Sequence, residues 1–298
     1  MPETYTPQIS VIIVNYNTAD FIGRCLDSVI RQQGVSHEII VVDNASVDGS
    51  EALIRQQYPM VRIIANPHNA GFAAANNQAV GCCRGGCLFF LNPDATAAEG
   101  CLEAIVAFME ANPSVGIAGT AILDPDGSHH PSVHAHYAGG RRARRIVAGL
   151  PGDIAWVLGA AMAMPTNVMR HLGGFDERFF LYGEEQDLCL RIRQSGRTVG
   201  YIPEARVTHW GGQSERRHAL ENIFEKKFIA EYQFYQKHYP PAVVRHIWRT
   251  SCLQAACRLM SLYPMKRIGS ETARPAEKRC KYRTFLRMAS SLRNSAGF

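Results

Sequence analysis

The N-terminal third of the chain alternates short apolar runs with segments of helical periodicity. Apolar, β-branched runs occupy residues 9–14, 38–42, 61–65 and 87–91, and polar turn residues follow each of them. Apolar side chains recur at helical spacing over residues 21–30, and a further helix is expected over 99–111. Strands that alternate with helices through short connections predict an α/β fold, with a mostly parallel sheet covered by helices on both faces.

Polar residues stand where three of these strands end. Asn15, Asp43 and Asp94 follow the first, second and fourth apolar runs. Ligands of such sheets bind beyond the carboxyl ends of the strands, so these residues predict a ligand site at one edge. A helix-capping role for Asp43 is the alternative. The sequence has neither a GxGxxG motif after the first strand nor a GxxxxGK[ST] motif, which argues against dinucleotide and P-loop sites.

The pattern changes beyond residue 115. Residues 128–149 contain an arginine cluster and four histidines with little to bury, so a surface loop is expected. Metal binding is the alternative for these histidines, although no regular spacing orients them; they are His129, His130, His134 and His136. Residues 154–164 are apolar but too short to cross a bilayer, and we expect a buried segment there.

The C-terminal part differs from the rest in charge. Helical patterns cover residues 222–239 and 243–263. From residue 241 to the end, twelve Lys and Arg stand against two Asp and Glu, a net charge of +10 in a chain whose total is +6. We therefore expect two regions: an α/β domain over residues 1–215, and a basic, amphipathic helical region over residues 216–298 with a partner of its own.

Composition narrows the class of protein. The content of 46% hydrophobic and 19% charged residues is typical of a globular chain. There is no apolar stretch of about eighteen residues, and the N-terminus lacks a signal-peptide pattern. The nine cysteines form no CxxC pair, so reduced, buried thiols are expected. Together these features predict a cytoplasmic protein.

The densest group of carboxylates lies at Glu184, Glu185 and Asp187. If a helix begins at Glu184, its dipole favours acidic residues in the first turn, which is the purely structural interpretation. Aromatic residues at 179, 180 and 182 precede the cluster. An aromatic wall desolvates a carboxylate and raises its pKa, which suits a general base.

Six stretches resemble those of family-two glycosyltransferases, and specifically the bacterial rhamnosyltransferase-like branch that builds cell-surface polysaccharides. They occur in family order between residues 9 and 214, and they are VIIVNYN (11–17), VVDNASVDGS (41–50), NPHNAGFAAANNQA (66–79), FLNPDA (90–95), GGFDERFFLYGEEQDLCLR (173–191) and ARVTHWGGQS (205–214). The resemblance implies a GT-A fold and an inverting glycosyltransferase that uses a nucleotide-sugar. The alternatives are a nucleotidyltransferase, which usually has a glycine- and lysine-rich loop after the first strand, and a non-catalytic nucleotide-sugar-binding scaffold.

The resemblance also implies where the donor binds. Asn15, Tyr16 and Asp43 match positions that hold the base and ribose. The loop and helix start beside the nucleotide correspond to Asn69, Gly71 and Asn77. The segment that lines the sugar or acceptor site corresponds to Trp156, Gly159 and Ala160, with a plain core role as the alternative for Trp156.

Asp94 matches the last aspartate of the family's metal motif, which implies Mg²⁺ or Mn²⁺ on the donor diphosphate. Asn-Pro-Asp stands here where many relatives have Asp-x-Asp, which predicts weaker metal binding. His209 matches a histidine that binds metal or diphosphate in some relatives, and a structural role is its alternative. Glu185 occupies the position of the catalytic base, but Glu-Glu-Gln-Asp replaces the usual Glu-Asp-x-Asp, so Asp187 stays an alternative base with Glu184 beside it.

The resemblance implies classes of substrate and does not single out one. It implies dTDP-L-rhamnose or a UDP-hexose as donor, and a glycan or lipid-linked glycan in surface polysaccharide synthesis as acceptor. The basic C-terminal region predicts peripheral attachment to an anionic membrane surface on the inner face of the cell membrane, with a solvated basic face as the alternative. No recognition motif accompanies its charge, so nucleic acid is not expected as a partner.

Overall fold

The computed structural model describes residues 6–211, 219–262 and 273–296, which fall into two units. The larger unit comprises residues up to 137 together with 149–180 and those from 184 to 211. The smaller unit comprises residues 138–148, 181–183 and the C-terminal helices. The domain boundary expected between residues 215 and 216 lies outside the described residues, as do residues 212–214 of the last matching stretch.

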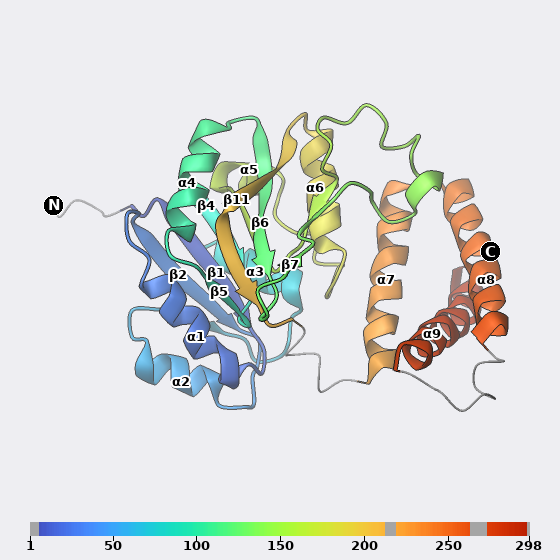
Figure 1. Cartoon of the computed structure of the whole chain (residues 1–298), viewed down its shortest axis with the longest axis horizontal. Coiled ribbons are helices and arrows are strands. Elements are labelled where there is room, and N and C mark those ends of the chain that lie inside the picture. Colours follow the sequence, from blue (N-terminus) through green and yellow to red (C-terminus); the bar gives the residue numbers. More distant parts are fainter. Residues whose placement is uncertain (1–5, 212–218, 263–272, 297–298) are drawn as a thin grey trace. The chain divides into compact units, whose positions relative to one another are not determined.

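One large sheet forms the centre of the first unit (Figure 1). Its strands run in the order β3-β2-β1-β4-β10-β6-β11-β5, and β7 pairs with β6. The strands are β1 (Ile9–Asn15), β2 (His37–Asp43), β3 (Arg62–Ala65), β4 (Cys87–Leu91), β5 (Ala95–Ala97), β6 (Val115–Leu123), β7 (His129–His130), β10 (Ala161–Pro165) and β11 (Thr198–His209). A separate hairpin joins β8 (Val133–His134) to β9 (Trp156–Val157).

Parallel pairing joins the strands that the sequence predicts. The β1–β2 register runs from Ile9 opposite His37 to Asn15 opposite Asp43, and this register brings the two polar strand ends side by side. In contrast, β10 runs antiparallel to both β4 and β6. The apolar segment at 154–164 is therefore two strands with a break at 158–160. The sheet is mixed, and the α/β class expected from the sequence is confirmed.

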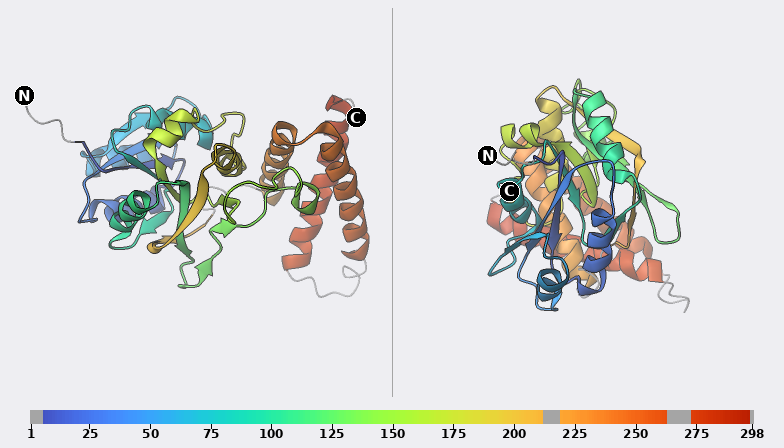
Figure 2. Two further views of the ribbon diagram at one scale, coloured as in Figure 1. Left: turned by 90° about the horizontal axis from the view of Figure 1, so that it is seen from above. Right: turned by 90° about the vertical axis from the view of Figure 1, so that its left-hand side faces the viewer.

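Six helices flank this sheet (Figures 1 and 2). They are α1 (Ala19–Ile30), α2 (Ser50–Gln57), α3 (Phe72–Val80), α4 (Cys101–Ala111), α5 (Thr166–His171) and α6 (Glu184–Gln194). Because successive strand residues point to opposite faces, Val11 packs in one core with α1 and α4, while Ile12 packs in a second core with α3, α5 and α6. Burying each such side chain contributes about 1.5–3 kcal/mol.

The smaller unit is built on three helices, α7 (Leu220–His238), α8 (Pro241–Leu262) and α9 (Ala273–Ala296), which pack against one another (Figure 1). The helical patterns at 222–239 and 243–263 correspond to α7 and α8. Trp248 of α8 lies between Tyr232 of α7 and Phe285 of α9, with ring centroids 5.2 and 5.5 Å away. Within the described residues, no helix is both long enough and apolar enough to cross a membrane.

The segment between β6 and β9 has little regular structure, as its composition predicts. Besides β7 and β8 it contains one short 3₁₀ helix, Gly140–Arg142. His130 lies 3.2 Å from Asp124, and His134 stacks on Trp156 with ring centroids 3.8 Å apart. Across the described parts of the chain, no three His, Cys, Asp or Glu side chains are grouped as metal ligands. These contacts tie His130 to the end of β6 and His134 to the β8–β9 hairpin.

Candidate active site

Asn15 ties together the carboxyl ends of β1 and β2. Its side-chain nitrogen Nδ2 donates to Asp43 Oδ1 at 2.7 Å, to Ser50 Oγ at 2.8 Å and to Ser46 Oγ at 3.1 Å. The second oxygen of Asp43 accepts from the Ser46 backbone N–H at 3.0 Å. Both side chains are almost completely buried. The amide of Asn15 therefore acts inside the fold and fixes the orientation of the Asp43 carboxylate.

Asn44 holds the loop that follows β3, a function that the sequence did not indicate. Its Nδ2 donates to Asn69 Oδ1 at 3.1 Å and to the carbonyl of Gly71 at 3.2 Å. Its Oδ1 accepts from the Ala70 N–H at 3.2 Å and from Asn66 Nδ2 at 2.9 Å. The only sequence signal was an amide directly after Asp43 at a predicted strand end. The buried Asn44 thus links the nucleotide-matching positions of β2 and of the 66–71 loop.

Gly71 lies against the segment that precedes the acidic cluster. The backbone N–H of Phe72 donates to the Phe180 carbonyl at 2.7 Å. Gly71 has a φ of +85°, and a Cβ there would lie 2.6 Å from the same carbonyl oxygen. Any side chain would therefore push the two segments apart. Glycine at this position permits the 173–180 loop to dock on the N-terminus of α3.

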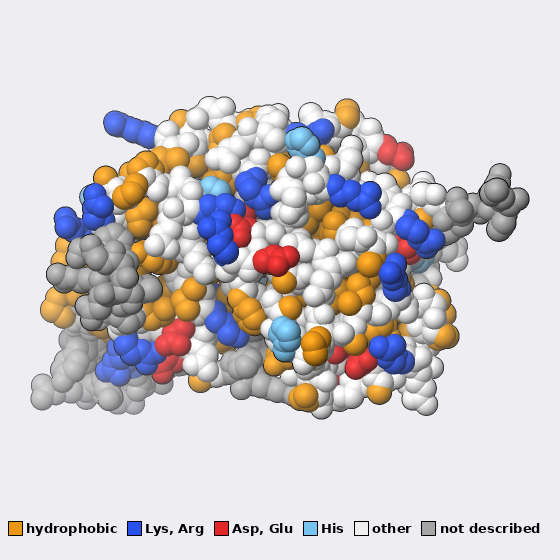
Figure 3. Space-filling model, turned by 180° about the vertical axis from the view of Figure 1, so that it is seen from behind, with side chains coloured by type: hydrophobic (Ala, Val, Ile, Leu, Met, Phe, Trp, Pro, Cys, Tyr) orange, Lys and Arg blue, Asp and Glu red, His pale blue; other side chains and the backbone are white. Residues whose placement is uncertain are grey.

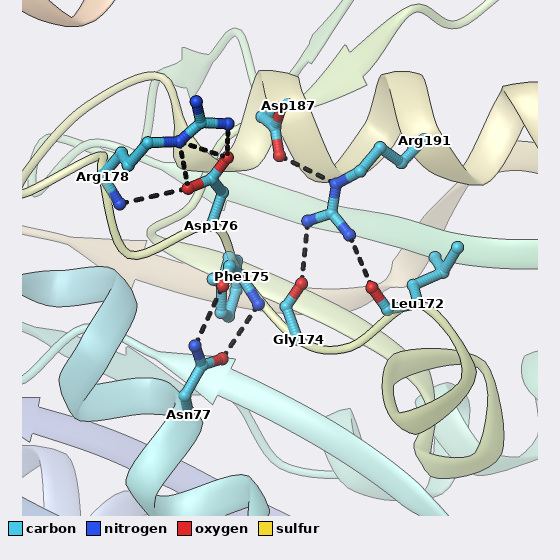
Figure 4. A network of polar contacts seen from close by, with 8 residues as sticks. All are labelled: Asn77, Leu172, Gly174, Phe175, Asp176, Arg178, Asp187 and Arg191. Carbon is cyan, nitrogen blue, oxygen red and sulfur yellow. Dashed lines mark hydrogen bonds and ion pairs between the residues drawn. The ribbon is translucent and has the colours of Figure 1, made fainter. Parts of the chain in front are cut away.

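Asn77 of α3 provides the second attachment of this loop (Figure 4). Its Nδ2 donates to the Phe175 carbonyl at 2.9 Å, and its Oδ1 accepts from the Phe175 N–H at 2.9 Å. Gly174 has a φ of +81°, and a Cβ there would lie 2.5 Å from Asn77 Oδ1. The side-chain amide of Asn77 thus bonds to both the backbone N–H and the backbone carbonyl of Phe175, as a neighbouring β-strand would.

Arg191 forms the third attachment, together with Asp187 (Figure 4). Its Nε lies 2.8 Å from Asp187 Oδ2, and Asp187 is fully buried. Its two terminal nitrogens donate to the carbonyls of Leu172 at 3.0 Å and Gly174 at 2.8 Å. The i, i+4 spacing of Asp187 and Arg191 was the available sequence signal for this ion pair. The pair fixes α6 to the start of the loop.

Glu184 and Glu185 begin α6, directly after two residues with left-handed backbone, Tyr182 (φ +70°) and Gly183 (φ +82°). Both carboxylates are buried. Burial, and next the charge of Glu185, raise the pKa of Glu184 well above its usual value. The positive end of a helix dipole lowers the pKa of a carboxyl group, but desolvation outweighs it here. A Cβ at Gly159 would lie 3.9 Å from Glu185 Cβ, so the β9–β10 connection passes beside Glu185.

Asp94 and His209 meet at the carboxyl end of the sheet. The antiparallel pairing of β11 with β5 sets His209 opposite Ala95, and His209 Nε2 lies 3.2 Å from Asp94 Oδ1. Adjacent ligand atoms of an octahedral cation with bonds of about 2.1 Å are about 3 Å apart, so this spacing fits one shared divalent ion. Asn92 Nδ2 lies 3.4 Å from the same His209 nitrogen.

A chain of contacts connects this pair to the acidic cluster. The Asn92 N–H donates to the Ala160 carbonyl at 2.9 Å, and the neighbouring Gly159 packs beside Glu185. Trp156 stands earlier in the same segment, where it stacks on His134 and donates through Nε1 to the His136 carbonyl at 2.9 Å. Tyr16 is half-buried immediately after β1. The fold therefore links Gly159 and Ala160 to both groups, while the indole N–H of Trp156 is used within its hairpin.

Known proteins are similar to this chain in sequence and in fold. N-acetylglucosaminyl-diphospho-decaprenol L-rhamnosyltransferase of Mycobacterium tuberculosis is 27% identical over 248 residues, which cover 73% of this chain and 81% of that protein. Pre-mycofactocin glycosyltransferase of the same organism is 27% identical over 296 residues, 96% of this chain and 58% of that protein.

A mannosyltransferase from Pyrobaculum calidifontis, solved in complex with GDP-Man and Mn²⁺, has a similar fold. The two structures superpose with a TM-score of 0.61 at 17% identity, covering 99% of this chain and 88% of that one. This neighbour supports the GT-A fold. Residues 10–177 match the family described as Glycosyl transferase family 2. The chain therefore belongs to glycosyl transferase family 2 and is a glycosyltransferase.

Proposed function

We propose that the chain is an inverting glycosyltransferase in which Glu185 is the general base. The observation that supports this most is the buried Glu184–Glu185 pair, connected through Gly159 and Ala160 to the Asp94–His209 pair. The glutamate pair can accept a proton from an attacking hydroxyl, and the Asp94–His209 pair can bind a metal ion that stabilises the leaving diphosphate. A single displacement between two such groups requires no covalent glycosyl-enzyme.

The positions of the three carboxylates favour Glu185 as the base. The pKa of Glu184 is raised by burial and by the charge of Glu185, because two adjacent buried carboxylates do not ionise together easily. Glu185 is the member of the pair that lies beside the β9–β10 connection. Asp187 forms an ion pair with Arg191, with 2.8 Å between Asp187 Oδ2 and Arg191 Nε, and we assign Asp187 a positioning role.

The proposed reaction is one displacement. Glu185 takes the proton of the acceptor hydroxyl while that oxygen forms a bond to the anomeric carbon. The bond from the anomeric carbon to the phosphate oxygen breaks at the same time, and its electron pair leaves with the nucleotide diphosphate. Attack occurs opposite the leaving group, so the configuration inverts.

On the donor side we assign contact roles to Tyr16, Asp43 and Asn69. Asn15, Gly71 and Asn77 act mainly on the fold, because their contacts hold Asp43 or the 173–180 loop. The donor that we propose first is dTDP-L-rhamnose, with UDP-hexoses as the other class. The name of the rhamnosyltransferase relative supports this order.

Asp94 and His209 would hold Mg²⁺ or Mn²⁺, and their 3.2 Å separation supports this assignment. A bound divalent ion neutralises the charge that develops on the leaving diphosphate. Asn92 contributes an amide where a second carboxylate would bind more strongly, so we propose modest metal affinity.

We propose a glycan or lipid-linked glycan as acceptor and the inner face of the cell membrane as the place of reaction. The relative named for a diphospho-decaprenol substrate supports a lipid-linked acceptor. The net charge of +10 over residues 241–298 supports attachment to an anionic membrane surface.

A panel of nucleotide-sugars tests this function. We expect dTDP-L-rhamnose to raise the melting temperature more than UDP- and GDP-sugars do, since ligands stabilise the state that binds them. We also expect slow release of the nucleotide diphosphate from the same donor. If no donor shifts the melting temperature or is turned over, the proposed transfer reaction is wrong.

A further inference from the structure

A cavity of about 480 Å³ lies between α8 and α9. Its volume is within the range of small-molecule sites. The residues that line it include Arg245, Trp248, Arg249 and Cys252 of α8, and Leu286 and Ser290 of α9. All of these residues belong to the helical unit, and none of them is among the residues assigned to sugar transfer.

Two guanidinium groups of this cavity pair with no carboxylate among the residues that the structure describes. Arg245 and Arg249 are one helical turn apart on α8, and no carboxylate of a described residue lies within ion-pairing distance of either. Arg287 of α9 contrasts with them, because it pairs with both Glu221 and Glu225 of α7. Both arginines are solvent-exposed, so their guanidinium groups at the edge of the cavity are accessible to an anionic ligand.

The cavity wall is held in place by aromatic packing. Trp248 contacts Tyr232 at 5.2 Å and Phe285 at 5.5 Å between ring centroids, and Phe285 also packs on Phe228 at 5.0 Å. These contacts join all three helices. Because the indole is fixed, the two arginines start from a preorganised backbone, and less ordering is needed when a ligand binds.

An exposed apolar stripe lies next to the cavity on α8. Leu253 and Met260 are each 67% exposed, and their spacing of seven residues places them on one face of the helix. Leu253 is one turn beyond Arg249 of the cavity. Exposed leucine and methionine beside unpaired arginines form the combination that an amphiphile with an anionic headgroup would contact.

We propose that the α8–α9 cavity binds a phosphate group carried by an amphiphile. Arg245 and Arg249 would donate charge-assisted hydrogen bonds to the phosphate oxygens, which guanidinium groups match in geometry. The Ser290 hydroxyl lines the opposite wall, and Leu253 and Met260 would contact the acyl chain. This inference deepens the membrane attachment proposed above and is independent of the sugar-transfer chemistry.

The two arginines that line one cavity provide a discrete site for a phosphate. On the face shown in Figure 3, the Lys and Arg side chains stand in several separate places among uncharged and hydrophobic ones. A scattered distribution gives a weak, screened attraction. Two unpaired arginines in one cavity instead focus charge at one point, where a single phosphate can meet both.

The first test uses the full chain and a short-chain phosphatidic acid kept below its micelle concentration. The variant Arg245→Gln/Arg249→Gln is compared with Arg258→Gln/Lys278→Gln, which removes equal charge from α8 and α9 outside the cavity. We expect calorimetry to show at least about tenfold weaker binding for the cavity variant and less than about twofold for its control. Equal affinities of the two variants would overturn the site.

A protection experiment on the wild-type chain distinguishes a lipid phosphate from free inorganic phosphate. Phosphatidic acid should slow alkylation of Cys252 in the wild-type chain, with the partly exposed Cys82 of the larger unit as the internal reference in peptide mass spectrometry. Inorganic phosphate should protect far less, because it lacks the acyl contact. If inorganic phosphate protects Cys252 as well as the lipid does, free phosphate is the ligand and the amphiphile is ruled out.

Vesicle sedimentation and donor binding distinguish the lipid-site proposal from the sugar-transfer proposal. The wild-type chain should sediment with phosphatidylcholine vesicles that contain phosphatidic acid, and the cavity variant should sediment less than its control. The melting-temperature shift with dTDP-L-rhamnose should stay the same in all three proteins. Loss of that shift in the cavity variant alone would show that the substitution acts through the transfer site, which contradicts the inference.

Discussion

Asp187 and Arg191 form an ion pair with a fully buried carboxylate, in which Arg191 Nε lies 2.8 Å from Asp187 Oδ2. The guanidinium also donates to the carbonyls of Leu172 and Gly174, so it connects α6 to the loop that Gly71 and Asn77 hold from the other side. Glu184 and Glu185 begin the helix that this loop leads into. The position of the acidic pair therefore depends on residues that do not themselves belong to it.

Asp187→Asn is expected to lower the free energy of unfolding by about 3 kcal/mol, because it leaves a partly buried guanidinium without its charge partner. Asp176→Asn in the same loop is the control. Its partner Arg178 is 67% exposed, so that change should cost less than about 1 kcal/mol. Urea denaturation measures both. If Asp187→Asn abolishes transfer at unchanged stability, Asp187 is the base and the positioning role is wrong.

Glu184→Gln is expected to stabilise the protein at neutral pH. The pKa of Glu184 is raised by burial and by Glu185, so the folded protein holds this proton more tightly than the unfolded chain. Wild-type stability should therefore fall as pH rises above the ordinary carboxyl value of 4.5. Melting temperatures at pH about 5 and about 8 should show a gain for the variant mainly at the higher pH. The exposed Glu110→Gln is the control, and an equal gain at both values would refute the assignment.

Gly174→Ala should destabilise the loop more than Gly173→Ala. Both glycines have positive φ, +81° and +73°, and this costs about 1 kcal/mol for alanine at either position. At Gly174 the new Cβ would also lie 2.5 Å from Asn77 Oδ1, whereas nothing lies within 4 Å at Gly173. We expect at least about 2 kcal/mol for Gly174→Ala in urea denaturation. Equal losses of unfolding free energy in the two variants would mean that the Asn77 side chain moves aside at no energetic cost.

Asp94→Ala should lower transfer by about a hundredfold and weaken Mn²⁺ binding in the presence of nucleotide diphosphate. Asn92→Asp should act in the opposite direction on the metal, because it adds a carboxylate 3.4 Å from the His209 nitrogen. Calorimetric titration of Mn²⁺ measures both changes. Unchanged transfer by Asp94→Ala in EDTA would remove the metal from the mechanism.

Local patterns predicted β1, β2 and β4, three of the strands that carry the site. The apolar run at 87–91 coincides with β4, and Asn15 and Asp43 end neighbouring strands as expected. These features depend on hydrophobic periodicity and on the general rule for strand ends, both of which are written in short stretches of sequence. The α/β class followed from the same information.

Contacts between distant segments could not be predicted in this way. Asn77 pairs with Phe175, and Arg191 donates to the Leu172 and Gly174 carbonyls, although nothing in the local sequence selects those partners. The segment at 154–164 gave no sign that β10 would run antiparallel between β4 and β6. Such features are set when the chain packs, because backbone polar groups take whichever buried partner the tertiary fold offers.

The central claim is that Glu185 removes the acceptor proton at a site held by the 173–180 loop. Its most direct test is single-turnover transfer by wild type, Glu185→Gln and the remote control Glu110→Gln, with nucleotide diphosphate release and donor binding measured on the same samples. We predict that Glu185→Gln binds donor as wild type does while transfer falls by at least about a hundredfold, the range of general-base catalysis. Transfer by Glu185→Gln within about twofold of the control, at equal donor binding, would contradict the account, since a lost general base costs far more.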